Sequence, residues 1–147
     1  MQQFKNMDTK DFQTRIESAK AKIRQQIDQI NRTANSRSLN VLDTGVGGSE
    51  HSYRIEERRR INGKIDREAC TITGTLYGYI DFLSNCQNSN ELWQWLQREL
   101  IPRPIYKEKG GIDWPAWWEE QRKSPLNTEF GRQYGQALQK IYSCFWV

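Results

Sequence analysis

With 147 residues, of which 36% are hydrophobic and 27% charged, the chain has the length of one domain and a composition typical of a fold with much exposed surface. It has no run of about 18 apolar residues and no apolar segment after Met1, so we expect neither a membrane-spanning helix nor an export signal, and a single cytoplasmic domain over 1–147. The net charge of +4 comes from residues 1–60, which carry 12 Lys and Arg against 8 Asp and Glu, and such a basic half can bind phosphates.

The first predicted element is a long helix over 8–34. Apolar residues recur there in steps of three and four, which places them on one stripe of an α-helix. The stripe consists of Phe12, Ile16, Ala19, Ile23, Ile27, Ile30 and Ala34. Asp8 or Thr9 can cap the start, and no Gly or Pro interrupts the run. At about 1.5 Å per residue this helix is about 40 Å long, so it needs a long partner to cover its isoleucines.

Residues 35–50 are predicted to form a loop, because Ser, Asn and Gly dominate the segment. Its three glycines resemble a phosphate-binding loop only superficially. No lysine follows them and no convincing strand precedes them, and a P-loop requires both. The segment is therefore interpreted as a flexible connector.

The next segment, 52–86, fits two structures, of which the first is a helix. Its apolar residues again repeat in steps of three and four. These residues are Ile61, Ile65, Ala69, Ile72, Leu76, Ile80 and Leu83. On such a helix Gly74 and Gly78 share a face with Cys70, and this stripe of small residues would let another helix approach closely.

The second possibility is a set of strands. Asn62-Gly63 is a strong two-residue hairpin turn, and residues 71–80 alternate and have high β propensity. A short sheet would, however, leave much of the first helix uncovered, so we prefer the helix. The predicted fold is mainly α, a long antiparallel helical hairpin plus a small Trp-rich helical C-terminal part. The alternative is an α+β fold with a hairpin or meander at 52–83.

Residues 89–147 form this aromatic helical part. Asp113 can cap a helix that has Pro115 in its first turn. Prolines fix the preceding segment in an extended conformation. The predicted elements are a helix over 90–100, an extended basic loop over 101–112, a helix from 113 to about 123 and a last helix over 127–144.

The cysteines and the single histidine do not form a recognisable reactive site. Cys70, Cys86 and Cys144 lie far apart in the sequence, and a structural zinc site needs about four Cys or His ligands at short spacings. We interpret them as buried free thiols. His51 has no identifiable nucleophile or orienting group. We therefore expect no metal site, no cofactor and no catalytic residue.

The sharpest basic feature is a run of three arginines at 58–60. Together with cations of the first helix, these side chains would track one phosphate backbone. The candidate nucleic-acid-binding residues are Arg54, Arg58, Arg59, Arg60, Arg15 and Lys22. The alternative is that the charges serve only solubility, with Glu56 and Glu57 pairing locally.

Six tryptophans are the main oddity of the composition, and Trp is enriched at protein–protein hot spots. The candidate partner-binding residues are Trp114, Trp117, Trp118, Arg103, Tyr106 and Lys107. Two other roles compete for the tryptophans, namely packing in the core of the C-terminal part and stacking on nucleic-acid bases.

Excess cations and tryptophans thus occupy different halves of the chain. This separation favours a non-catalytic helical accessory subunit that contacts nucleic-acid phosphates and docks a protein partner in a nucleoprotein assembly. The alternative is a pure protein–protein interaction module, such as an adaptor, assembly chaperone or small inhibitor. A small carboxylate-dependent enzyme would need at least two acidic side chains to converge. The candidates for such convergence are Asp66, Glu68, Asp113, Glu119 and Glu120.

Overall fold

The computed structural model describes residues 8–38, 67–125 and 127–146, and within these ranges the chain forms helices and connecting segments but no strand. The helices are α1 (Thr9–Ser38), α3 (Arg67–Asn85), α4 (Ser89–Glu99), α5 (Trp114–Lys123) and α6 (Glu129–Phe145). The prediction of a mainly α fold is confirmed, and the α+β alternative is wrong for residues 67–83. None of these helices combines the length and the apolar character that crossing a bilayer requires.

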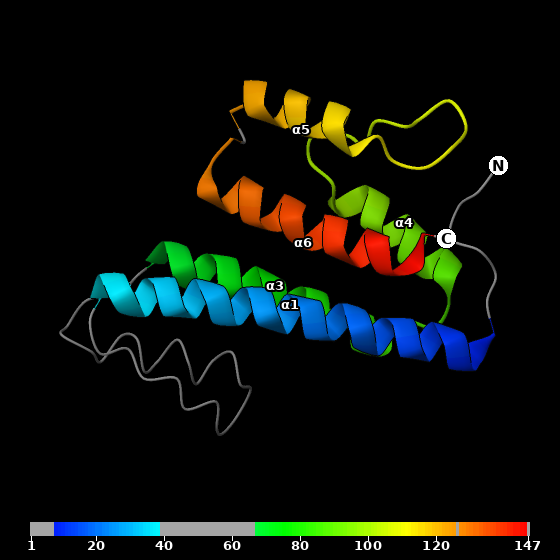
Figure 1. Cartoon of the computed structure of the whole chain (residues 1–147), viewed down its shortest axis with the longest axis horizontal. Coiled ribbons are helices and arrows are strands. Elements are labelled where there is room, and N and C mark those ends of the chain that lie inside the picture. The colour runs from blue at the N-terminus through cyan, green and yellow to red at the C-terminus, as the bar shows by residue number, and fades with distance from the viewer. Residues whose placement is uncertain (1–7, 39–66, 126, 147) are drawn as a thin grey trace.

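Helices α1, α3 and α6 form the centre of the fold, and α1 runs antiparallel to the other two (Figure 1). The predicted apolar stripe of α1 faces them and is buried. Its buried members are Phe12, Ile16, Ala19, Ile23, Ile27 and Ile30. The predicted antiparallel hairpin of α1 and α3 is thus joined by α6, so two helices rather than one cover the long stripe.

The first helix is longer than predicted, because α1 continues to Ser38. Residues 35–38 are therefore helical, and the predicted loop over 35–50 is wrong for them. The sequence has no Pro or Gly before Gly45, so no helix-breaking residue ends α1 earlier. Residues 39–50 lie outside the described part of the chain.

Helix α3 shows that the helical pattern, and not the β pattern, describes the C-terminal part of 52–86. The predicted helical stripe is buried there. Its members are Ala69, Ile72, Leu76, Ile80 and Leu83. Burying such side chains is worth about 1.5–3 kcal/mol for each large one, which outweighs helix-propensity losses of at most about 0.7 kcal/mol for an ordinary residue and about 1 kcal/mol for a glycine. The buried Thr73 hydroxyl donates to the Ala69 carbonyl at 2.9 Å, so the helix also satisfies this polar group. Residues 52–66, with the Asn62-Gly63 turn, lie outside the described residues.

The C-terminal helices begin close to the predicted positions because side chains cap them. The capping residues are Asn88 for α4, Asp113 for α5 and Thr128 for α6. Each accepts a hydrogen bond from the backbone amide three residues later, at 2.8, 3.1 and 3.2 Å respectively. Between α4 and α5, Gly110 and Gly111 take φ values of 94° and 85°, which glycine adopts without steric cost, and they close the turn of the connecting loop.

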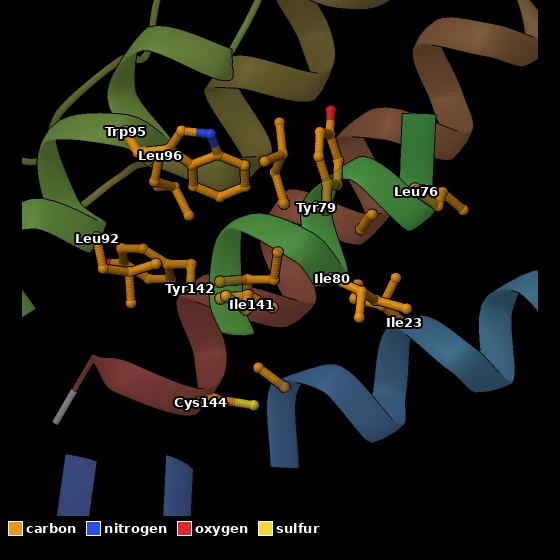
Figure 2. Close-up of a cluster of buried hydrophobic side chains, with 14 of the residues drawn as sticks. Ile23, Leu76, Tyr79, Ile80, Leu92, Trp95, Leu96, Ile141, Tyr142 and Cys144 are labelled. Carbon is orange, nitrogen blue, oxygen red and sulfur yellow. The ribbon is translucent and has the colours of Figure 1, made fainter. Parts of the chain in front are cut away.

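Aromatic and aliphatic side chains of α4 and α6 join those of α1 and α3 in one core (Figure 2). Trp95 of α4 stacks on Phe82 with ring centroids 4.3 Å apart and meets Tyr79 edge-on at 5.3 Å. Phe12 and Phe145, 5.6 Å apart, join the start of α1 to the end of α6. The aromatic residues of the C-terminal part therefore contribute to the same core as the long helix.

Candidate functional site

The predicted phosphate-contacting residues fall into two groups. Arg54, Arg58, Arg59 and Arg60 lie outside the described residues, so their placement stays a prediction. Arg15 and Lys22 lie on α1, where both come close to residues of α6. The contact between α1 and α6 is therefore the place where the structure shows the surroundings of predicted phosphate-contacting cations.

Arg15 holds the two helices together. Its Nη1 donates to the Cys144 carbonyl at 2.8 Å, and its Nε donates to Asp11 Oδ2 at 3.2 Å. The Cys144 carbonyl lies in the last turn of α6, where the partial negative charge of the helix end favours a cation. Arg15 thus ties α1 to the end of α6.

Lys22 lies near another cation, Lys140 of α6. Burial, and secondly the charge of Lys22, lower the pKa of Lys140. The Lys140 Nζ donates to Gln26 Oε1 at 3.1 Å, and within the described ranges neither lysine forms an ion pair. We call Lys22 and Lys140 the lysine pair. Two neighbouring ammonium groups that form no ion pair attract an anion placed near both.

Amide side chains connect the lysine pair to the rest of α6. Gln26, only 5% exposed, donates from Nε2 to the Gln133 carbonyl at 2.9 Å and to Gln133 Oε1 at 2.8 Å. Gln133 Nε2 in turn donates to Glu129 Oε1 at 2.9 Å. The two glutamines and Lys140 line a polar cavity of about 230 Å³ between α1, α6 and the start of α3. We call Lys22, Gln26, Gln133 and Lys140 the α1–α6 seam.

Sequence reasoning missed Lys140, because it placed the cations on a hairpin of the first two long elements. The position of Lys140 depends on α6 lying along α1, which no local pattern shows. A weak signal was present, since Lys140 is seven residues after Gln133 and so shares its side of a helix.

Two of the predicted partner-binding tryptophans belong to the core. Trp114 is 8% exposed and Trp117 is 1% exposed. The Trp117 indole donates from Nε1 to the Pro102 carbonyl at 2.8 Å, and Trp114 packs edge-on against Tyr142 with centroids 5.5 Å apart. In this fold both side chains serve packing, the competing role, and neither offers its ring to a partner at the surface.

The remaining partner-binding candidates lie nearer the surface. Trp118 is half-buried and donates from Nε1 to Gln139 Oε1 at 2.9 Å. Residues 101–112, which we call the docking loop, carry the three others. These are Arg103, Tyr106 and Lys107, all exposed. The Tyr106 hydroxyl donates to Gln97 Oε1 at 2.6 Å, which holds the ring against α4.

Two of the carboxylates considered for catalysis, Asp113 and Glu119, are engaged in structural contacts, and Glu120 is exposed on α5. Asp113 caps α5. Glu119 accepts a hydrogen bond from Arg122, which together with the charges of Arg122 and Lys123 lowers its pKa. Asp66 and the side chain of Glu68 lie outside the described residues.

A second cavity, of about 420 Å³, lies between α3, the end of α4, and the α5–α6 region. We call it the aromatic pocket, after Tyr79, Trp117, Phe130 and Tyr134 in its walls. Ile101, which is 62% exposed, lines it as well. Sequence reasoning missed this pocket because its residues come from elements far apart in the chain.

No family model, curated protein or solved structure matches this chain.

Proposed function

We propose that this protein is a non-catalytic helical accessory subunit of a nucleoprotein assembly. It contacts nucleic-acid phosphates through the α1–α6 seam and a protein partner through the docking loop. The observation that carries the proposal is the lysine pair. Burial, and secondly the charge of Lys22, lower the pKa of Lys140, and no described carboxylate forms an ion pair with either lysine. Such a pair is electrostatically unfavourable until an anion neutralises it.

A phosphate backbone fits the chemistry of the seam. Lysines make sequence-independent contacts to phosphate oxygens. Each ammonium–phosphate contact releases condensed counterions, so the affinity falls as salt rises. The predicted contacts of Arg54 and of the arginines at 58–60 would add to the number of phosphate contacts.

The docking loop supports the second half of the proposal. Its residue Tyr106 is 48% exposed, yet the hydrogen bond to Gln97 already fixes the orientation of the ring. A fixed aromatic side chain loses little conformational entropy on binding. Arg103 and Tyr106 line one shallow hollow together with Arg98, and Arg and Tyr are the residues enriched at hot spots. The alternative function, a pure protein–protein interaction module, would use this loop without nucleic acid.

Fluorescence anisotropy with labelled single-stranded DNA, double-stranded DNA and RNA tests the phosphate half. Titrations at several salt concentrations between about 50 and 200 mM give the salt slope. The double variant Lys22→Glu/Lys140→Glu should weaken binding on every sequence and reduce the salt slope by about two, since about one unit is lost per phosphate contact. Lys123→Glu, an exposed position on α5, is the control for the same charge change at one site.

Three outcomes contradict the phosphate half. The wild-type protein could fail to bind any probe at low salt, which would leave the interaction module. The Lys123→Glu control could lose as much affinity per charge as the seam variant, which would assign binding to net charge alone. The seam variant could keep its salt slope.

For the docking loop, Tyr106→Ala should abolish capture of a protein partner from nuclease-treated native lysate, and unchanged capture would contradict that half.

A further inference from the structure

We propose that the aromatic pocket binds a small organic cation with a methylated ammonium head group. The pocket lies apart from the lysine pair, and this inference does not depend on the proposed function. It rests on the aromatic walls of the pocket, on the charge at its edge and on the hydroxyl of the buried residue Tyr79, which has no hydrogen bond to a described residue.

The aromatic walls are held in place by the fold. Phe130 and Tyr134 lie side by side on α6 with ring centroids 6.5 Å apart. The Tyr134 hydroxyl accepts a hydrogen bond from Thr75 at 3.2 Å, and the Trp117 indole is fixed to the Pro102 carbonyl. The faces of such rings carry negative potential and attract a cation within about 6 Å of the ring centre. The pocket is therefore preorganised for a positive charge.

The formal charge of the pocket has the matching sign. Glu99 is the only charged side chain among the described residues that line it, and none of the described cations forms an ion pair with it. Glu99 is also the last residue of α4, where the helix carries partial negative charge. The opposite partial charge at the start of α6 is offset by its own acidic first-turn residue, Glu129, and by the Thr128 cap.

Tyr79 supplies an unpartnered polar atom in the same pocket. The residue is 5% exposed, and its hydroxyl makes no hydrogen bond to any described residue. Figure 2 shows this hydroxyl pointing away from α1. Burial, and secondly the charge of Glu99, raise the pKa of Tyr79, so the phenol stays neutral. Its oxygen can face a positive charge or pair with a hydroxyl on the ligand.

The walls favour a methylated ammonium over a primary amine. A primary ammonium needs several acceptors to replace its lost water, and the pocket offers few polar atoms. A methylated ammonium has apolar methyl groups on its surface and is recognised by aromatic rings instead. The volume of about 420 Å³ is large enough for the head group and a short chain attached to it.

The test compares choline with 3,3-dimethylbutan-1-ol, a neutral molecule of the same shape, on the full chain. Titrations followed by two-dimensional ¹H–¹⁵N NMR report on the Trp117 indole N–H, and calorimetry gives the affinity. Choline should shift this signal and bind about tenfold or more tightly than the alcohol, the ratio expected for a desolvated cation–π site. Glu99→Gln should weaken choline binding severalfold without affecting the alcohol.

Glu120→Gln, at an exposed position on α5, removes the same charge elsewhere and should leave the choline affinity unchanged. Equal affinity for choline and the alcohol would overturn the assignment of a cation and indicate a neutral apolar ligand. If neither molecule perturbs the Trp117 signal, the pocket is not a ligand site. If Glu120→Gln weakens choline binding as much as Glu99→Gln, the effect is one of net charge.

Discussion

Replacing Gly135 with alanine probes the close contact between α5 and α6. A Cβ atom at this position would lie 2.7 Å from Cη2 of Trp117 and 2.7 Å from Cη2 of Trp118. Both contacts involve rigid indole rings, and Trp117 is fully buried, so relief requires the two helices to move apart. Overpacking of this kind costs about 1–3 kcal/mol, whereas alanine gains about 1 kcal/mol over glycine in helix propensity. Gly135→Ala should therefore lower the free energy of unfolding by up to about 2 kcal/mol.

Gly78→Ala is the matched control, because this exposed glycine in the middle of α3 would place its Cβ in open space, with nothing within 4 Å. It should stabilise the protein by up to about 1 kcal/mol. Urea unfolding, followed by far-ultraviolet circular dichroism and tryptophan fluorescence, measures both variants against the wild type. The difference between the two isolates the overpacking term. If Gly135→Ala were as stable as Gly78→Ala, the close contact would not exist as described.

Three further predictions concern stability and thiol chemistry. Gln26→Leu removes the amide that bridges α1 and α6 and leaves Lys140 without its acceptor, so urea unfolding should show a loss of about 1–3 kcal/mol; an unchanged midpoint would contradict the network. Burial raises the pKa of the Cys86 thiol from 9.0 to about 11, so iodoacetamide should label the half-exposed Cys70 first and Cys86 only on unfolding, as seen by mass spectrometry. Above a pH of about 9 the Cys86 thiol is deprotonated in the unfolded chain but keeps its proton in the folded protein. Its contribution to the free energy of unfolding should therefore fall between about pH 9 and about pH 11. If the difference in stability between the wild type and Cys86→Ala did not change over this pH range, the prediction would be wrong.

Features that depend on residues close together in the sequence could be predicted. The stripe of α1, from Phe12 to Ile30, is buried as its spacing indicated. The Asp113 cap of α5 is also confirmed, because a cap needs only the amide three residues later. Residues 71–80 were ambiguous since their β propensity opposed their helical period, and burial against α1 and α6 settled the conflict in favour of the helix.

Features that depend on which helices meet could not be predicted. Gly78 was expected to let a helix approach closely, but its surroundings are open, and the glycine at a close contact is Gly135. The spacing of glycines along one helix does not say which side its neighbour occupies. Lys140 was missed because the sequence likewise does not show that α6 lies along α1. Composition likewise identified tryptophan as unusual without showing that Trp117 points inward.

The packing of α6 along α1 has a consequence for biosynthesis. Arg15 and the Cys144 carbonyl that it binds are 129 positions apart, so this contact forms only after the whole intervening chain has been translated. Until α6 has been made, only α3 can cover the isoleucines of α1. An apolar stripe that stays exposed during synthesis favours aggregation, and contacts of this separation slow the final folding step.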